Sequence, residues 1–360
     1  RIEPYEVIDF SANINPLGPS QRGLSALESQ LRYISHYPDA TNDDILNAIA
    51  DIYGMNKNQI VVGNGAAELL YAICRLPGYT GAFVPAPGFS EYKAALEASR
   101  IPVRDIYYRP REDEHGKPYF EVPYLALETF AAELKGQDGR IIVFLGNPNN
   151  PDGTLLDKNH IRTIASMLKD ANSLLVIDES FIDFVGNDTL QDNEYSMRSL
   201  VNEFDNIIVV HSFTKFYAVP GLRIGAAFSN PLIIEQLNSF IPTWSVNTLA
   251  QSYTEAALND VEYVKRTKQV LHEEQLFMHN SLDTIDNITV YPPSANFMLF
   301  HIEQEGITAE SINEVLKKYN MIVRNCDSYM GLNNQWVRVA IKDHDTNVKL
   351  VEKLTDILKV

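Results

Sequence analysis

Short runs of apolar residues recur along the first two thirds of the chain, at residues 60–62, 82–85, 141–145, 174–177 and 207–211. Continuous apolar runs of this length are typical of strands that are buried on both faces. Between these runs, apolar residues recur at helical spacing over residues 69–75, 90–98 and 158–169. Strands that alternate with helices predict an α/β fold with a parallel sheet.

The pattern changes from about residue 290 onward. It predicts a strand at 296–302, a helix at 309–319, strands at 321–324 and 336–341, and a final helix. We interpret this part as a smaller α+β domain. Turn signals at Asn15-Pro16 and Gly18-Pro19 lead us to expect the first thirty or so residues to pack beside it. We therefore predict a large α/β domain over residues 35–250 and a small α+β domain built from residues 1–34 and 251–360.

Composition narrows the classes of partner. The 360 residues carry a formal charge of −17, which argues against a nucleic-acid partner, because phosphate backbones are bound by basic surfaces. No apolar stretch approaches the roughly eighteen residues of a membrane span. The eight histidines show no close metal-ligand spacing, so no metal is expected. Two cysteines, Cys74 and Cys326, and no secretory signal favour the cytoplasm. Because the sequence opens at Arg1, a short preceding piece is expected.

The segment 212–225 directly follows the apolar run 207–211 and contains the most informative lysine, Lys215. A lysine at the carboxyl end of a strand sits where α/β sheets bind ligands. Burial near another cation such as Arg223 would lower its pKa and favour a nucleophilic amine. The hydroxyl groups of Ser212 and Thr214 could bind a phosphate together with Arg223. Taken alone, the short motif is better explained by a solvated turn, because short motifs match by chance.

Three further strand ends carry candidate chemistry. Asp178 ends the run 174–177 and could pair with a protonated pyridine nitrogen, although a helix cap is the commoner use of such a carboxylate. Asn150 lies in the turn-rich Asn147-Pro-Asn-Asn-Pro-Asp-Gly153 and could donate to a phenolate oxygen, if the turn is more than a plain loop. The segment 63–68, Gly-Asn-Gly-Ala-Ala-Glu, opens a helix whose amides could hold a phosphate.

In this order and at these positions, the four segments resemble those of the aspartate-aminotransferase superfamily, the fold-type I pyridoxal-phosphate enzymes. The resemblance covers essentially the whole chain. It implies a mostly parallel seven-stranded sheet between helices in the large domain, and pyridoxal 5′-phosphate as the cofactor. It makes Lys215 the lysine that forms the Schiff base and Asp178 the partner of the pyridine nitrogen. The other implied cofactor ligands are Asn150, Ser212, Thr214, Arg223 and the loop residues Gly65, Ala66 and Ala67.

The same resemblance assigns roles to three more residues. Phe89, in Pro87-Gly-Phe-Ser-Glu-Tyr92, lies where the family stacks an aromatic ring on the cofactor. Tyr37 matches the tyrosine that reaches the cofactor phosphate from the neighbouring subunit, which implies a homodimer with shared active sites. Arg338, in Trp-Val-Arg-Val-Ala, matches the arginine that binds the substrate α-carboxylate.

Within the superfamily, the subgroup of histidinol-phosphate aminotransferases and threonine-phosphate decarboxylases is the most similar. Arg324 matches the second arginine of this subgroup, which faces the substrate phosphate, so the expected substrate is a small phosphorylated amino acid. The decarboxylase branch is favoured by residues 8–18, which include the expected substrate ligand Asn15, by residues 242–247, and by residues 324–326 with 329–332. Phe181 stands where the aminotransferases usually have a tyrosine, which also favours decarboxylation.

These features predict decarboxylation of O-phospho-L-threonine to (R)-1-aminopropan-2-yl phosphate, a step in building the cobalamin side chain. The alternative is an aminotransferase of the histidinol-phosphate type, because the same lysine, aspartate and arginines serve both reactions. A non-catalytic cofactor-binding regulator is a third reading, which the acidic charge disfavours.

The sequence departs from the family pattern in three places. Asp152 replaces the usual threonine of the asparagine motif, and Ala67 stands where phosphate-binding loops often have a hydroxyl residue. The sequence also begins too late to show the N-terminal His-Gly-Gly segment with which the decarboxylases approach their substrate. Backbone donors remain at both loop positions, so cofactor binding is still expected.

Overall fold

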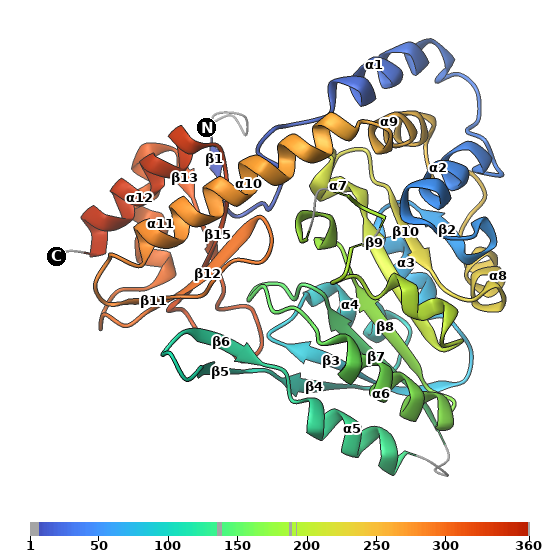
Figure 1. Cartoon of the computed structure of the whole chain (residues 1–360), viewed down its shortest axis with the longest axis horizontal. Coiled ribbons are helices and arrows are strands. Elements are labelled where there is room, and N and C mark those ends of the chain that lie inside the picture. The colour runs from blue at the N-terminus through green and yellow to red at the C-terminus, as the bar shows by residue number, and fades with distance from the viewer. Residues whose placement is uncertain (1–6, 135–138, 187–188, 192, 359–360) are drawn as a thin grey trace.

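A seven-stranded sheet forms the centre of the larger part of the molecule (Figure 1). The computed structural model describes residues 7–134, 139–186, 189–191 and 193–358. In order across the sheet, the strands are β2 (Ile60–Gly63), β10 (Gly225–Phe228), β9 (Ile207–Ser212), β8 (Leu174–Asp178), β7 (Arg140–Gly146), β3 (Tyr79–Ala86) and β4 (Val103–Tyr107). β10 runs antiparallel to both its neighbours, and the other pairings are parallel. The predicted fold class and the five predicted strands are confirmed.

Helices cover both faces of this sheet. Along β7, Val143 and Leu145 pack into one apolar core, while Ile142 and Phe144 pack into the other. Because successive side chains of a strand point to opposite faces, two covered faces require a continuous apolar run. The first core is closed by α2 (Asp43–Tyr53), α5 (Tyr124–Glu133), α6 (Lys158–Asp170) and α9 (Thr248–Leu258), and the second by α3 (Ala66–Ile73), α4 (Ser90–Ala98) and α8 (Pro231–Phe240).

A second, antiparallel sheet lies beside the first, at the left of Figure 1. Its strands, in order, are β11 (Ile288–Val290), β12 (Phe297–Ile302), β15 (Trp336–Ala340) and β14 (Arg324–Asn325). It shares a core with α10 (Val261–Leu282), α11 (Ala309–Leu316) and α12 (His344–Leu358). The strand predicted at 321–324 is split, because β13 (Met321–Ile322) pairs instead with β1 (Ile8–Asp9) in parallel.

The N-terminal segment divides between the two parts. Residues 8–10 join the small part, where Phe10 is buried and its carbonyl accepts a hydrogen bond of 2.7 Å from the Ala340 amide. Helix α1 (Gln21–Gln30) packs along α9 instead, so the expectation for the first thirty residues holds only for their beginning. The domain boundaries at residues 34/35 and 250/251 stay a prediction.

A hairpin that the sequence pattern did not predict extends toward the small part. It consists of β5 (Arg109–Glu112) and β6 (Pro118–Glu121). Its buried Phe120 ring lies 5.1 Å from the ring of Tyr291 and 5.5 Å from that of Trp336. The hairpin thereby helps to fix the small sheet relative to the strand ends of the large one. Among the described helices, none is both long and apolar enough to span a membrane.

Candidate active site

The carboxyl ends of the parallel strands meet at one edge of the large sheet, and the predicted residues gather there. Asp178 ends β8, Ser212 ends β9, and Lys215 lies on the short helix α7 (Phe213–Phe216) that follows. They line a cavity of about 120 Å³. Its walls are formed by Ala66, Ala67, Phe89, Tyr92, Pro148, Asn150, Asp178, Ser180, Phe181, Ser212, Thr214, Lys215 and Arg223.

One end of the cavity is rich in hydrogen-bond donors. The hydroxyl groups of Ser212 and Thr214 are buried and lie 2.8 Å apart. Ala66 and Ala67 occupy the first turn of α3, whose amides point out of the helix and favour an anion. Arg223 adds a guanidinium group to the same wall. This set of donors suits a phosphate group.

Two glycines permit the close approach of Arg223 to this helix. Gly65 caps α3 with a φ of 82°, and a Cβ atom there would collide with the guanidinium of Arg223. A Cβ atom on Gly225 would lie 2.6 Å from the Ala66 amide nitrogen. Arg223 itself has a φ of 59°, a left-handed conformation that is costly for a side chain of this size. The local backbone is therefore shaped around the phosphate end of the cavity.

Lys215 has an environment that favours a neutral amine. Burial lowers the pKa of Lys215, and the guanidinium groups of Arg223 and Arg338 lower it further, whereas Asp178 opposes them. A lowered pKa makes a nucleophilic, unprotonated amine more accessible near neutral pH.

Asp178 is held by two side chains that the sequence reasoning missed. Its Oδ2 accepts a hydrogen bond of 2.8 Å from the Tyr92 hydroxyl. Its Oδ1 accepts from the Ser180 hydroxyl at 2.5 Å and from the Ser180 amide at 2.9 Å. The sequence could have indicated Tyr92, because it lies three residues after Phe89 on the first turn of α4 and residues at this spacing are neighbours on a helix.

Asn150 is oriented from the small sheet. Its Oδ1 accepts hydrogen bonds from Arg338 Nη1 and, at 3.3 Å, from the Tyr329 hydroxyl. This leaves the amide nitrogen of Asn150 as the donor toward the cavity. The Tyr329 hydroxyl also lies 3.2 Å from Arg338 Nη1, and Arg338 Nη2 donates to the Ser11 carbonyl at 2.6 Å. Tyr329 had been noted in the sequence, but without a role.

Two arginines face each other on neighbouring strands of the small sheet. Arg324 on β14 and Arg338 on β15 are direct cross-strand partners. The Nε atoms of both are buried, and neither has a hydrogen-bond partner among the described residues. Burial lowers the pKa of Arg338, and Arg324 is among the groups that lower it further. Like charges directly opposite one another destabilise a sheet. Bound anions would neutralise this pair, so the two arginines favour anion binding.

Five predicted residues do not line this cavity, namely Gly65, Arg324, Arg338, Tyr37 and Asn15. The side chain of Tyr37 is 78% exposed, and its ring stacks on that of Trp244 with 4.5 Å between centroids. Tyr37 therefore does not contribute to the cavity of its own chain. Asn15 donates to the Phe216 carbonyl at 2.7 Å and to Thr267 Oγ1 at 2.9 Å, and its oxygen accepts from an amide. Its amide is used inside the protein, so the geometry does not support a substrate ligand at Asn15.

Asp152, the departure from the asparagine motif, braces the loop that carries Asn150. One of its carboxylate oxygens accepts from the Thr154 amide at 2.9 Å, and the other accepts from the Asn149 side chain. Asn149 also donates to the Pro87 carbonyl at 2.9 Å, which ties this loop to the segment before Phe89. Burial is the main cause that raises the pKa of Asp152. Asp152 therefore holds the Asn147–Thr154 loop through hydrogen bonds at both of its carboxylate oxygens.

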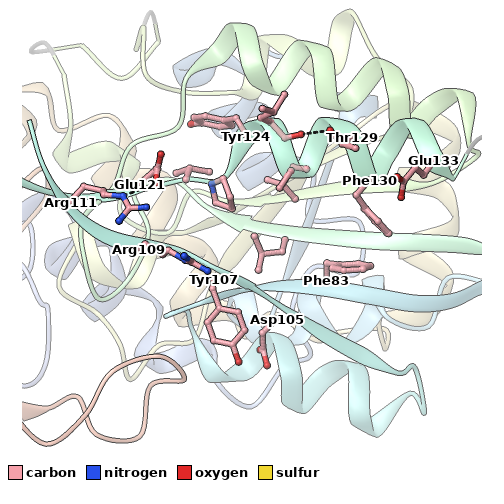
Figure 2. Close-up of a pocket in the computed structure, with 16 residues that line it drawn as sticks. Phe83, Asp105, Tyr107, Arg109, Arg111, Glu121, Tyr124, Thr129, Phe130 and Glu133 are labelled. Atoms are coloured by element: carbon pink, nitrogen blue, oxygen red, sulfur yellow. Dashed lines mark hydrogen bonds and ion pairs between the residues drawn. The ribbon is translucent and has the colours of Figure 1, made fainter.

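A larger hollow lies away from these residues. It has a volume of about 1010 Å³ and opens between β4, the β5–β6 hairpin and α5 (Figure 2). Figure 2 shows Arg111 beside Glu121 at one end, where they form an ion pair of 3.0 Å. Phe83 and Phe130 pack together at the other end. None of the predicted site residues lines this hollow, and nine of them, including Lys215 and Asp178, line the smaller cavity.

The residues of the smaller cavity fit pyridoxal 5′-phosphate. Its lining combines hydroxyl, amide and guanidinium donors, a carboxylate that accepts three hydrogen bonds, and a lysine with a lowered pKa. Phe89, 36% exposed, presents an aromatic ring to the same space. These groups match the phosphate, the pyridine nitrogen, the aldehyde and the ring face of that cofactor.

Comparison with known proteins agrees with this fit. The family profile described as Aminotransferase class I and II matches residues 5–354. The chain is 33% identical over 355 residues to the adenosylcobalamin biosynthesis bifunctional protein CobDQ of Leptospira interrogans, which covers 98% of the chain and 39% of that longer protein. It is 32% identical to threonine-phosphate decarboxylase of Salmonella typhimurium, over 99% of the chain and 93% of the relative.

Aminotransferases are nearly as similar. The chain is 29% identical to histidinol-phosphate aminotransferase of Methanothermobacter thermautotrophicus, over 98% of the chain and 90% of the relative. Among solved structures, histidinol-phosphate aminotransferase from Clostridium acetobutylicum matches with a TM-score of 0.87 at 26% identity, covering 98% of this chain and 99% of that one.

Proposed function

Because the chain belongs to the class I and II aminotransferase family and so depends on pyridoxal phosphate, we propose that it decarboxylates O-phospho-L-threonine to (R)-1-aminopropan-2-yl phosphate. The carboxylate carbon leaves as carbon dioxide, and a proton takes its place on Cα. The relatives named threonine-phosphate decarboxylase and adenosylcobalamin biosynthesis protein support this proposal. The product would then serve in building the cobalamin side chain.

The paired arginines are the observation that carries the proposal. O-Phospho-L-threonine has two anionic groups, a carboxylate and a phosphate, whereas histidinol phosphate has only the phosphate. Arg338, buried and close to Asn150, suits the carboxylate, and Arg324, opposite it on β14, suits the phosphate. A substrate with two anions satisfies two opposed cations and their buried Nε atoms.

The chain's own residues then divide the work. When bound, pyridoxal phosphate supplies an electron sink for the bond that breaks at Cα. Asp178, held by its donors, would favour a positive ring nitrogen. Arg338 fixes the carboxylate and so sets which bond at Cα is aligned for cleavage. Lys215, with its lowered pKa, is the group that can return a proton to Cα.

A homodimer with shared sites is part of the proposal. Tyr37 is exposed on the surface, is stacked on Trp244, and does not line the cavity of its own chain. A side chain so placed can complete the phosphate end of a neighbouring subunit's cavity. Activity in the cytoplasm stays a prediction from the sequence.

A second candidate is amino transfer from histidinol phosphate. It is favoured by the aminotransferase relative at 29% identity and by the structural match at a TM-score of 0.87. The same lysine and aspartate would serve this reaction, and the two arginines would together bind the dicarboxylate amino acceptor rather than histidinol phosphate.

One experiment separates the two candidates. Purified enzyme with pyridoxal phosphate and O-phospho-L-threonine, but without a keto acid, is assayed for carbon dioxide release over many turnovers. Sustained release is the expected result, because a transaminase stops after one turnover without an amino acceptor. If release is absent and histidinol phosphate with 2-oxoglutarate is turned over instead, the decarboxylase proposal fails.

A further inference from the structure

The Tyr92 hydroxyl connects the stacking ring of the site to its acidic residue. Tyr92 donates its hydrogen bond to Asp178 Oδ2 over 2.8 Å, across 86 residues of sequence. Its own ring contacts that of Phe89 edge-on, with 5.7 Å between centroids, and stacks on that of Phe144 at 5.3 Å. The side chain is therefore fixed on both sides, and the hydroxyl has one direction in which to point.

The environment keeps this hydroxyl protonated. Tyr92 is 3% exposed, and burial, followed by the charge of Asp178, raises the pKa of Tyr92 well above its ordinary value. Tyr108 and Tyr329 also raise the pKa of Tyr92, and Asp178 acts in turn on Lys215. Tyr92 therefore remains a donor over the range in which the enzyme would be assayed.

We propose that Tyr92 is a positioning residue that stabilises the ionised form of Asp178 and so helps to keep the cofactor ring positively charged. A hydrogen bond donated to a carboxylate stabilises its charged form. Ser180 does the same at the opposite oxygen, so both lone-pair edges of Asp178 are engaged while the carboxylate still faces the cavity. This inference rests on the proposed pyridoxal-phosphate chemistry, but it does not depend on the substrate.

Tyr108 offers a matched contrast. It is buried to the same degree as Tyr92, at 3% exposure, and it acts on Tyr92 electrostatically. Its hydroxyl, however, has no hydrogen-bond partner in the described parts of the chain. A Tyr→Phe substitution removes one buried hydroxyl at either position, but only at Tyr92 does it remove a donor to Asp178.

The test is a pH titration of the near-visible absorbance of holoenzyme, without substrate, for the wild type and for Tyr92→Phe, Ser180→Ala and Tyr108→Phe. Loss of the Tyr92 donor weakens the positive charge held on the ring, and that charge repels the proton on Lys215 Nζ. The titration midpoint of Tyr92→Phe should therefore rise by about one pH unit, the size expected for one charge-assisted hydrogen bond. Ser180→Ala should move in the same direction, and Tyr108→Phe should stay at the wild-type value.

Circular dichroism and cofactor affinity by equilibrium dialysis confirm that each variant is folded and loaded. An unchanged midpoint in folded, loaded Tyr92→Phe would overturn the inference, and so would an equal shift in Tyr108→Phe. Because the titration uses no substrate, a wild type that fails to release carbon dioxide from O-phospho-L-threonine would overturn only the proposed function. An enzyme that releases carbon dioxide but shows no shift would overturn only the role of Tyr92.

Discussion

Removal of the Arg324 guanidinium should weaken substrate use and strengthen the free protein at the same time. Arg324 and Arg338 are direct cross-strand partners, and both retain buried Nε atoms without a partner among the described residues. In the free enzyme these charges repel each other, whereas a bound phosphate and carboxylate would neutralise them. Arg324→Ala therefore tests two effects separately: the charge repulsion that destabilises the free enzyme, and the contact that favours binding of the substrate phosphate.

The two effects have different sizes. A hydrogen bond to a charged group contributes about 1.5–3 kcal/mol, so loss of the phosphate contact should lower kcat/KM for O-phospho-L-threonine by about 10- to 150-fold. Like charges opposite one another in a sheet cost roughly 0.2–1 kcal/mol, so the free energy of unfolding of the free variant should rise by a similar amount. Arg324→Lys keeps the charge but loses the paired donors of the guanidinium group. Its kcat/KM should therefore lie between those of wild type and Arg324→Ala.

The assay compares O-phospho-L-threonine with L-threonine as substrates, and thermal unfolding of the free enzyme is measured in parallel. Arg104→Ala, which removes an exposed arginine from edge strand β4, is the matched control and should leave both measurements unchanged. Equal losses of kcat/KM for both substrates would remove Arg324 from the phosphate site. A lower unfolding temperature for Arg324→Ala would refute the argument from opposed charges.

Three other perturbations test separate parts of the site and the fold. Lys215→Ala should abolish the near-visible absorbance of the bound cofactor together with turnover, and a variant that keeps both would refute the assignment of Lys215. Refolding a mixture of inactive Lys215→Ala with weakly active Tyr37→Ala should restore about a quarter of wild-type activity, because one site of each mixed dimer is then intact; no recovery would contradict a shared site. Although burial raises the pKa of Asp183, His211 and Arg198 outweigh it and lower that pKa to about 2, so Asp183 stabilises the fold above pH 3.8 and this contribution is lost as the pH falls through 2. In urea unfolding between pH 5 and pH 2, Asp183→Asn should therefore lose about 2 kcal/mol less than wild type, and equal losses would contradict the reasoning.

The sequence predicted the buried strands because residues such as Ile142 to Leu145 must satisfy two cores at once and so form an unbroken apolar run. It did not predict β10, whose Gly-Ala-Ala-Phe has no β-branched residue, or β4, an edge strand that carries Arg104 and Asp105. β10 lacks the residues that favour strands, and in β4 the charged Arg104 and Asp105 interrupt the strand-favouring Val103, Ile106 and Tyr107. Their assignment depends on neighbours that the sequence alone does not bring together.

The candidate site also combines residues that the sequence predicted with residues that it did not predict. Lys215 and Asp178 were predicted because each follows its own strand, and strand ends converge in this kind of sheet. The hydrogen bonds that orient them were not, because Tyr92 lies 86 residues from Asp178 and Tyr329 lies 179 residues from Asn150. Such pairs form only through the tertiary structure. The sequence likewise could not show that the amide of Asn15, a predicted substrate ligand, donates to Phe216 and Thr267, which lie 201 and 252 residues away.

The pairing of β1 with β13 determines how late in synthesis the small part of the enzyme can be completed. Ile8 pairs with Met321, and the Phe10 carbonyl accepts from Ala340, close to the end of the chain. At about 5–20 residues per second, a ribosome needs roughly 15–60 s between these partners. During that time the first strand has no place to dock, although the large sheet can already form. The nascent enzyme would therefore acquire its cofactor cavity well before the Arg338 contact to Ser11 closes the substrate side, and this last step must follow release of the C-terminal strands from the ribosome.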